Sequence, residues 1–264
     1  MDRRNFFGLG LIGIVTSLTS LTTSEADAKE RRRQREQSID RIIKGIDVSH
    51  HQRNIRWNKV RSNGYIFAYI KASEGIDWKD PNFDIYLSNA KKAGLYVGCY
   101  HYATCKPDKR GRYNPILDAK TEAEYFLKTA KKGLEASCMR PALDLEHVPG
   151  IDKLTNEQLA EFVITWMDLI KTRIGAEPLL YGFKYSKKAA DGDPKILDDY
   201  DIWLAHYGWM PNPKPWKRPL LWQYDKTGKI PGVQGGDTNG YVDLNMFYGT
   251  IAEFEKKMLI PSRG

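Results

Sequence analysis

The chain has 264 residues, enough for one large domain or two small ones. Hydrophobic residues make up 41% and charged residues 28%, a balance that is typical of a globular protein and excludes a collagen-like or wholly disordered chain. The formal net charge of +8 favours approach to an anionic surface such as a cell wall, and because no recognised binding motif accompanies it we expect no nucleic-acid partner.

The first residues have the features of an export signal. Arg3 and Arg4 precede an apolar stretch from Phe6 to about Leu21, and Ala26-Asp27-Ala28 supplies a small-x-small cleavage site. We therefore expect residues 1–28 to be a signal peptide, and the mature protein to be exported, periplasmic or secreted, without a stable membrane anchor. The arginine pair also resembles a twin-arginine signal, and an ordinary signal peptide shares these features, so both export routes stay open.

The rest of the chain is predicted to be a linker followed by one domain. Residues 29–40 are polar and charge-dense without apolar periodicity, which predicts disorder. No internal repeat divides residues 41–264, so we expect a single domain and a monomer. Short apolar runs alternate there with helical patterns, as in a parallel sheet. The predicted strands are Ile42–Ser49, Tyr65–Ala72, Leu95–Tyr102, Pro141–Glu146, Pro178–Phe183, Asp201–His206, Pro219–Tyr224 and Tyr241–Leu244.

The helical patterns lie between the early strands. The clearest begins at Thr155, which forms a capping box with Gln158, and ends at Gly175. After the sixth strand, residues 210–219 are rich in Pro and residues 226–239 in Gly, and neither segment holds a helix easily. The pattern predicts an α/β barrel that begins as β/α units and ends as plain β strands. The other predicted helices are Asn54–Arg61, Asp80–Ala93, Asp118–Lys132 and Tyr185–Ala190.

Two acidic residues end the fourth predicted strand. Asp144 and Glu146 are two positions apart, so their side chains should point to the same side. The carboxyl ends of barrel strands form the active-site face, and neighbouring carboxylates raise each other's pKa, which keeps one of them a proton donor near neutral pH. Glycosidases use such a pair. A D-x-E motif by itself also fits a structural ion pair.

Two further acids are expected at the same face. Asp47 ends the first strand, and Asp243 lies in the last strand, which barrel closure should bring beside the first. An aspartate at a loop start is often only a cap or a turn former. Acids from the first, fourth and eighth strands together favour a catalytic site.

The chain also resembles a known family of enzymes, the family 25 lysozymes, over residues 45–258. Their characteristic segments occur here in the family order, with KASEG and VSHHQ as variant spellings that leave the acids in place. The segments are GIDVSHHQ, YIKASEG, GCYHYA, PALDLE, WLAHY, LWQY and VDLNMF. The resemblance implies a TIM-like (β/α)5(β)3 barrel and an N-acetylmuramidase that cleaves the β-1,4 bond between N-acetylmuramic acid and N-acetylglucosamine in peptidoglycan.

The resemblance also implies a role for each acid. Glu146 matches the proton donor to the glycosidic oxygen. Asp144 matches the residue that assists the N-acetyl group of the substrate or stabilises positive charge at the anomeric carbon. Asp47 and Asp243 match acids that shape the site.

Aromatic residues near the strand ends are candidates for binding a glycan, because flat rings stack on the apolar faces of sugars. Strand alternation sends about half of such side chains into core layers instead. Lys71 and Glu74 are predicted either to contact substrate or to form a structural ion pair, and His101 and His206 to be hydrogen-bonded barrel or rim residues. The aromatic candidates are Tyr100, Tyr102, Trp203, Tyr207, Trp222 and Tyr224.

Two rival functions remain open. A metal-dependent polysaccharide deacetylase would use Asp and His on a related barrel, but the five histidines include no pair at i, i+4 and no cysteine pair has zinc spacing, so we expect no metal and no other cofactor. A non-catalytic glycan-binding protein would keep the cleft without turnover, and retention of all four acids argues against it. Cys99 and Cys138 lie on neighbouring predicted strands about four residues out of register, beyond disulfide reach. Cys105 is a weaker candidate partner.

Overall fold

The computed structural model describes residues 27–29, 42–106, 112–208, 216 and 219–262. The predicted signal peptide and linker therefore lie outside the described residues, apart from a helical turn at residues 27–29. The chain divides between Arg41 and Ile42 into two compact units, and the second contains the fold.

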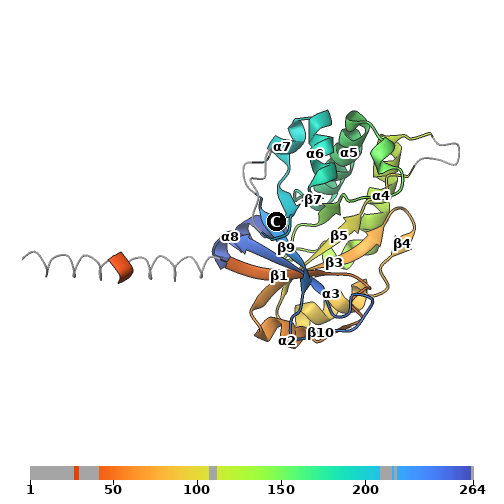
Figure 1. Cartoon of the computed structure of the whole chain (residues 1–264). Helices are drawn as coiled ribbons and strands as arrows, with labels where there is room; N and C mark the ends of the chain where they lie inside the picture. The colour runs from red at the N-terminus through yellow and green to blue at the C-terminus, as the bar shows by residue number, and fades with distance from the viewer. Residues whose placement is uncertain (1–26, 30–41, 107–111, 209–215, 217–218, 263–264) are drawn as a thin grey trace, which may run out of the picture. The chain divides into compact units, whose positions relative to one another are not determined.

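A closed barrel of eight strands forms the second unit (Figure 1). The strands are β1 Ile42–Val48, β3 Tyr65–Glu74, β5 Tyr96–Tyr102, β6 Ala142–Asp144, β7 Leu179–Gly182, β8 Ile202–Ala205, β9 Leu221–Gly228 and β11 Val242–Tyr248. Neighbouring strands from β1 through β9 run parallel in that order. The last strand, β11, runs antiparallel to both β9 and β1 and so closes the barrel.

Helices follow each of the first five barrel strands. In the described part of the chain between β8 and β11 there is no helix, which confirms the predicted change from β/α units to plain strands. The helices are α2 Trp57–Ser62, α3 Phe83–Lys92, α4 Pro115–Ala130, α5 Asn156–Ile174, α6 Lys184–Gly192, α7 Lys195–Asp199 and α8 Ile251–Met258, with 3-10 turns at Lys131–Gly133 and Ile151–Lys153. Short strand pairs are formed by β2 Asn54–Ile55 with β10 Val233–Gln234, and by β4 Trp78–Lys79 with β3.

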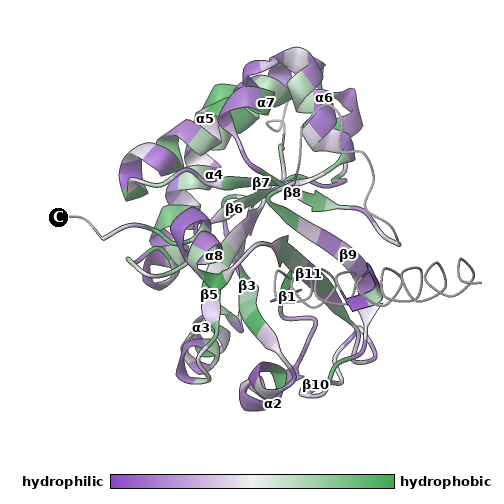
Figure 2. Cartoon of the chain, turned by 90° about the vertical axis from the view of Figure 1, so that its left-hand side faces the viewer, coloured by the Kyte–Doolittle hydropathy of each residue, from purple (hydrophilic) through white to green (hydrophobic). Residues whose placement is uncertain are grey.

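Helix α5 shows how sequence signals set an element. Thr155 and Gln158 form the predicted capping box, and Gly175 ends the helix in the left-handed conformation with φ 75°. One face of the helix buries apolar side chains, including Phe162 and Trp166, against the strands. Figure 2 shows the same arrangement throughout the barrel, with hydrophobic strands at the centre and hydrophilic outer faces on the helices.

The barrel interior is filled by a second set of side chains. Phe67 and Tyr69 point inward from β3, and Trp203 from β8 packs on Tyr69 with 4.5 Å between ring centroids. Glycines on neighbouring strands make room for the rings, since a Cβ atom at Gly45 would lie 2.2 Å from Phe67 and one at Gly98 would lie 2.5 Å from Tyr69. This packed layer forms the floor beneath the carboxyl ends of the strands.

Several predicted boundaries were wrong. Strand β6 ends at Asp144, so Glu146 lies in the loop beyond it rather than in the strand. Helix α4 begins at Pro115 because Asn114 caps it, and α7 and α8 were not predicted.

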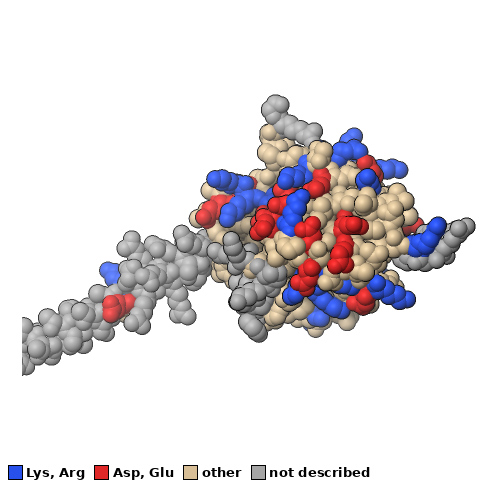
Figure 3. All heavy atoms as spheres, turned by 90° about the horizontal axis from the view of Figure 1, so that it is seen from above, with Lys and Arg blue, Asp and Glu red and all other residues tan. Residues whose placement is uncertain are grey.

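In the described residues no helix has the length and apolar composition to span a membrane. On the face seen in Figure 3, acidic and basic side chains are interspersed, so that face has no continuous basic stripe.

Candidate active site

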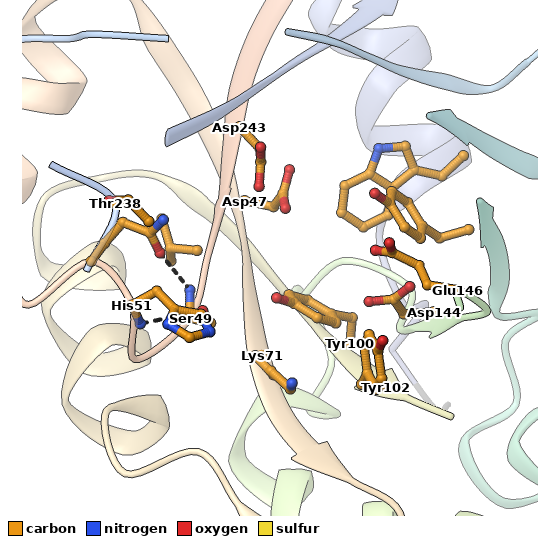
Figure 4. A pocket seen from close by; sticks show the side chains of 14 residues that line it. Asp47, Ser49, His51, Lys71, Tyr100, Tyr102, Asp144, Glu146, Thr238 and Asp243 are labelled. Atoms are coloured by element: carbon orange, nitrogen blue, oxygen red, sulfur yellow. Dashed lines mark hydrogen bonds between the residues drawn. The ribbon is translucent and has the colours of Figure 1, made fainter. Parts of the chain in front are cut away.

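A cavity of about 230 Å³ opens at the carboxyl ends of the barrel strands. All four predicted acids line it, which places residues from β1, β11 and the end of β6 around one space (Figure 4). Asp47 and Asp243 lie on one side, and Asp144 and Glu146 lie on the other. The remaining lining residues are Val48, Ser49, His51, Gln52, Lys71, Tyr100, Tyr102, Tyr181, Trp203 and Thr238.

Asp144 and Glu146 differ in their exposure. Asp144 is 5% exposed, and its Oδ1 has no hydrogen-bond partner within the described residues. Burial, followed by the Glu146 charge, raises the pKa of Asp144 well above 3.8. Glu146 stays open to solvent, yet the surrounding protein atoms raise the pKa of its carboxyl group above 4.5. Two such carboxyls side by side hold a proton more readily than either would in water.

Asp47 and Asp243 form a second carboxyl pair. They are direct cross-strand partners between β1 and β11, which confirms the predicted closure. Burial raises the pKa of Asp47 to about 6, and burial with the Asp47 charge raises the pKa of Asp243 to about 9. The two carboxyls therefore hold a proton between them to a higher pH than either would in water. The Oδ1 atom of Asp47 accepts hydrogen bonds from Asn245 Nδ2 at 2.6 Å and Gln223 Nε2 at 2.9 Å.

Lys71 supplies the positive charge inside the cavity. It is 7% exposed, and its Nζ donates to Glu74 Oε2 at 2.8 Å. The same nitrogen lies 4.4 Å from the centroid of the Tyr102 ring and 5.0 Å from that of Trp78. The Lys71 charge lowers the pKa of both Asp144 and Glu146, which partly offsets the effect of burial. Lys71 therefore forms the predicted ion pair with Glu74 and also lines the cavity.

The predicted aromatic residues divide into two groups. Tyr100, Tyr102 and Trp203 line the cavity, and Tyr207 is half exposed beside it, with its hydroxyl 3.0 Å from Gln223 Oε1. The structure does not bring Trp222 and Tyr224 to the cavity. Strand β9 points Gln223 inward, so by alternation its two neighbours face outward: the Trp222 indole donates to His206 O at 2.7 Å, and Tyr224 packs against the outer core.

Loops after β1 and before β11 form one wall of the cavity. Ser49 N donates to Gln52 Oε1 at 3.0 Å within the first loop, and Asp237 N donates to His51 O at 3.1 Å, which joins the two loops. Close approach requires Gly236, because a Cβ atom there would lie 1.9 Å from His51 O. The Thr238 hydroxyl oxygen is buried on this wall without a hydrogen-bond partner in the described segments.

Of the histidines, His51 lines the cavity, while His101 and His50 bond to carboxylates of Glu122 and Asp80. His101 is fully buried between Ser73 Oγ at 2.9 Å and Glu122 Oε2 at 2.8 Å, as expected for a hydrogen-bonded barrel residue. His50 pairs with Asp80 at 3.1 Å. Across the residues that the structure describes, no three His, Cys, Asp or Glu side chains are grouped so that they could hold a metal ion.

Sequence reasoning missed three polar residues of the site. Tyr181 lines the cavity from β7, while Gln223 on β9 and Asn245 on β11 bond to Asp47 beneath it. All three alternate with outward apolar side chains in their strands. Inward-facing polar residues in otherwise apolar strands were the available signal, but it does not reveal which partner each residue meets.

Comparisons with known proteins agree with this geometry. The family model for glycosyl hydrolases family 25 matches residues 46–233. Lysozyme M1 from Streptomyces globisporus is 31% identical over 217 residues, covering 80% of this chain and 69% of that protein. The solved bacterial lysozyme from Streptomyces coelicolor superposes with a TM-score of 0.65 at 29% identity, covering 80% of this chain and 94% of that one. A family 25 glycosyl hydrolase from Bacillus anthracis gives 0.65 at 26% identity, covering 81% and 92%. The chain therefore belongs to the glycosyl hydrolases of family 25.

Proposed function

We propose that this glycoside hydrolase is an N-acetylmuramidase that cleaves the β-1,4 bond between N-acetylmuramic acid and N-acetylglucosamine in peptidoglycan. The observation that carries the proposal is the pair Asp144 and Glu146 at the end of β6, in one cavity with Asp47 and Asp243. Relatives named lysozyme, including the autolytic lysozyme of Clostridium acetobutylicum, support the same substrate.

Glu146 is the general acid in this proposal. Its raised pKa makes the protonated form more populated than in a glutamate free in water, and its exposure leaves that proton accessible to a sugar in the cavity. As the bond between the anomeric carbon and the bridging oxygen breaks, its electron pair stays on the oxygen, which takes the Glu146 proton. Water then adds at the anomeric carbon and returns a proton to Glu146.

Asp144 stabilises the positive charge that develops during this step, either at the anomeric carbon or on the neighbouring N-acetyl group. Burial and the Glu146 charge raise the pKa of Asp144, and Lys71 partly offsets this by favouring its charged form, while the role proposed for Asp144 needs no proton transfer from it. Asp47 and Asp243 shape the opposite side of the cavity. Tyr100, Tyr102, Trp203 and the half-exposed Tyr207 provide ring faces for the glycan.

Export and assembly are part of the proposal. The arginine pair, the apolar stretch and the Ala26-Asp27-Ala28 site support removal of residues 1–28, followed by the linker 29–40, and delivery to the periplasm or the exterior. The catalytic unit then acts as a monomer on glycan strands. N-terminal sequencing of exported protein should find a start at or near Lys29, and a membrane-bound form that retains Met1 would contradict this.

Product analysis tests the bond specificity. Purified peptidoglycan is digested, the new reducing ends are reduced with borodeuteride, and the fragments are identified by mass spectrometry. A muramidase labels N-acetylmuramic acid. Label on N-acetylglucosamine would overturn the proposed bond, loss of acetyl groups without chain cleavage would favour the deacetylase, and binding without any product would favour a non-catalytic glycan-binding protein.

A further inference from the structure

A bulge in strand β9 brings a lysine to the rim of the cavity. The register between β9 and β11 slips next to the pair formed by Asp225 and Leu244. Before the next pair toward the cavity, β11 contributes only Asp243, whereas β9 contributes both Lys226 and Thr227. Two residues that oppose one form a β-bulge, which re-aims the side chains of the longer strand. Lys226 therefore lies across from Asp243, which lines the cavity.

Asp225 sets the local shape of this bulge. Its Oδ1 atom accepts hydrogen bonds from the backbone N and from the Oγ1 of Thr227, both at 2.8 Å. An aspartate that bonds to the backbone two residues further along forms a turn of its own. The carboxylate that precedes Lys226 in the sequence is thereby bonded to Thr227, and Lys226 lies at the exposed corner of the turn.

The Lys226 side chain extends over the ring of Tyr207, with its Nζ 5.3 Å from the ring centroid. The Tyr207 hydroxyl is held 3.0 Å from Gln223 Oε1, and Gln223 Nε2 donates to Asp47 in the cavity. The half-exposed ring beside the cavity is thus anchored at its hydroxyl and has a cation at its face. Burial raises the pKa of Glu146, and the Lys226 charge is among those that lower it, which agrees with a cation at the rim.

The Lys226 charge is not compensated, unlike that of Lys71. Lys71 is 7% exposed, and its Nζ donates to Glu74 Oε2 at 2.8 Å. Lys226 is exposed, and among the residues that the structure describes no Asp or Glu forms an ion pair with it. An unpaired cation beside a ring that can bind sugar is complementary to a glycan that carries an anion.

N-acetylmuramic acid supplies such an anion. It differs from N-acetylglucosamine by a lactyl ether, whose carboxyl group is ionised at neutral pH when no peptide is attached. When a stem peptide is attached, this carboxyl group is an amide and the peptide brings carboxylates of its own. We propose that Lys226 is a specificity-determining residue that binds a substrate carboxylate, on the lactyl group or on the stem peptide. This inference rests on the proposed muramidase function and names the group that the rim of the site recognises.

Three forms of one glycan strand test the proposal and separate the two sources. Peptide-free strands carry the lactyl carboxylate, the same strands coupled to ammonia with a carbodiimide are neutral, and peptide-bearing strands carry only peptide carboxylates. Lys226→Gln should lower kcat/KM by about threefold to fivefold on the strands whose carboxylate it binds, the size expected for one exposed ion pair. The loss should appear in KM rather than in kcat, because the contact is the same before and during bond cleavage.

Two further variants control for the change of charge and for the contact with Tyr207. Lys226→Arg keeps both the cation and the stacking, so it should retain the preference for charged over neutral strands. Lys44→Gln is the matched control, because Lys44 is exposed near the amino end of β1, away from the cavity, and its removal changes the net charge equally. It should change none of the three kcat/KM values. Added salt should reduce the preference of the wild type for charged strands.

The pattern across the strands decides the outcome. A loss on peptide-free strands identifies the lactyl carboxylate, and a loss on peptide-bearing strands identifies the peptide. An equal loss on all three forms, the neutral one included, would show that Lys226 acts through Tyr207 and would overturn the proposal, as would no loss on any form. If the wild type cleaves no strand, the proposed muramidase function falls; if it cleaves them and Lys226→Gln matches it, only the role of Lys226 falls.

Discussion

Burial raises the pKa of a carboxyl group outside the cavity, as it does for the acids inside it. Asp118, in the first turn of α4, is half-buried near Tyr113 and Glu122. Burial, followed by the Glu122 charge, raises the pKa of Asp118 from 3.8 to about 7. The folded protein thus holds this proton more tightly than the unfolded chain, so its stabilising contribution is complete below about pH 3.8 and is lost as the pH rises through 7.

We predict that Asp118→Asn raises the stability of the protein at pH 8 and changes it little at pH 4. Asparagine keeps the shape of the side chain but cannot ionise, so it removes the cost of a buried charge. With a discount for partial exposure, the gain at pH 8 should be about 1 kcal/mol, or roughly 2–4 °C in Tm. Differential scanning calorimetry at the two pH values measures it.

Glu157→Gln is the control with the opposite sign. Glu157 lies in the first turn of α5, where a hydrogen bond from a backbone N–H lowers the pKa of its carboxyl group. Its stabilising contribution is present above the unfolded pKa and lost as the pH falls, so Glu157→Gln should lower Tm at pH 8. Lower stability of Asp118→Asn than of the wild type at pH 8 would refute the explanation for Asp118.

At the scale of elements, Glu122 joins helix α4 to the sheet. Its fully buried carboxylate accepts from His101 Nε2 at 2.8 Å, from Thr104 Oγ1 at 2.6 Å and from the backbone N of Cys105 at 3.2 Å. The other ring nitrogen of His101 forms a hydrogen bond with Ser73 on β3. One side chain thus connects α4 to β5, to the loop after it and, through a histidine, to β3.

Glu122→Ala should destabilise the fold by about 3–5 kcal/mol, because it leaves His101, the Thr104 hydroxyl and the backbone N–H groups of Thr104 and Cys105 buried without their acceptor. Urea unfolding monitored by fluorescence measures the loss. Glu124→Ala is the matched control: Glu124 is on the same helix, is exposed and pairs with Arg173, so its removal should cost within about 0.5 kcal/mol. Equal losses in the two variants would show that the buried connection contributes nothing special.

Elements were predictable where a local signal was strong. The capping box and apolar stripe of α5 specify that helix within its own sequence, and all eight barrel strands lie where apolar runs were recognised. Strand β6 is only three residues long, and its end at Asp144 depends on pairing with β5 and β7 rather than on its composition. Helix α7 has five residues, too short for a periodic pattern to stand out.

At the scale of the whole molecule, closure of the barrel allowed the sequence to predict that the four acids lie at one site. It did not allow a prediction of the residues that hydrogen-bond to them. Asp47 and Asp243 follow from the closing pair of strands, whatever the finer register. The contact between Gln223 and Asp47 depends on irregular register between β9 and β11, which a sequence pattern does not disclose. The same register turned Trp222 and Tyr224 away from the cavity, since a shift of one residue exchanges the two faces of a strand.

The cysteines offer a further test of the whole fold. Cys99, Cys105 and Cys138 are all buried and free, which agrees with the expected absence of a bridge between Cys99 and Cys138. Burial raises the pKa of Cys99 and of Cys105 well above 9, so neither forms the reactive thiolate readily. We expect thiol titration to find three free thiols after denaturation without reductant and slow reaction in the native state. Fewer than three would reveal a disulfide.

The central claim is that Glu146 donates the proton that breaks the glycosidic bond. Its most direct test is the turnover rate of Glu146→Gln on purified peptidoglycan, measured with glycan binding and Tm, beside Glu161→Gln on the exposed face of α5. Glutamine keeps the size of the side chain but has no proton to give, so the rate should fall by about 10²–10⁴-fold while binding and Tm stay close to wild type. Glu161→Gln should remain fully active. Near-normal cleavage by Glu146→Gln would contradict the account.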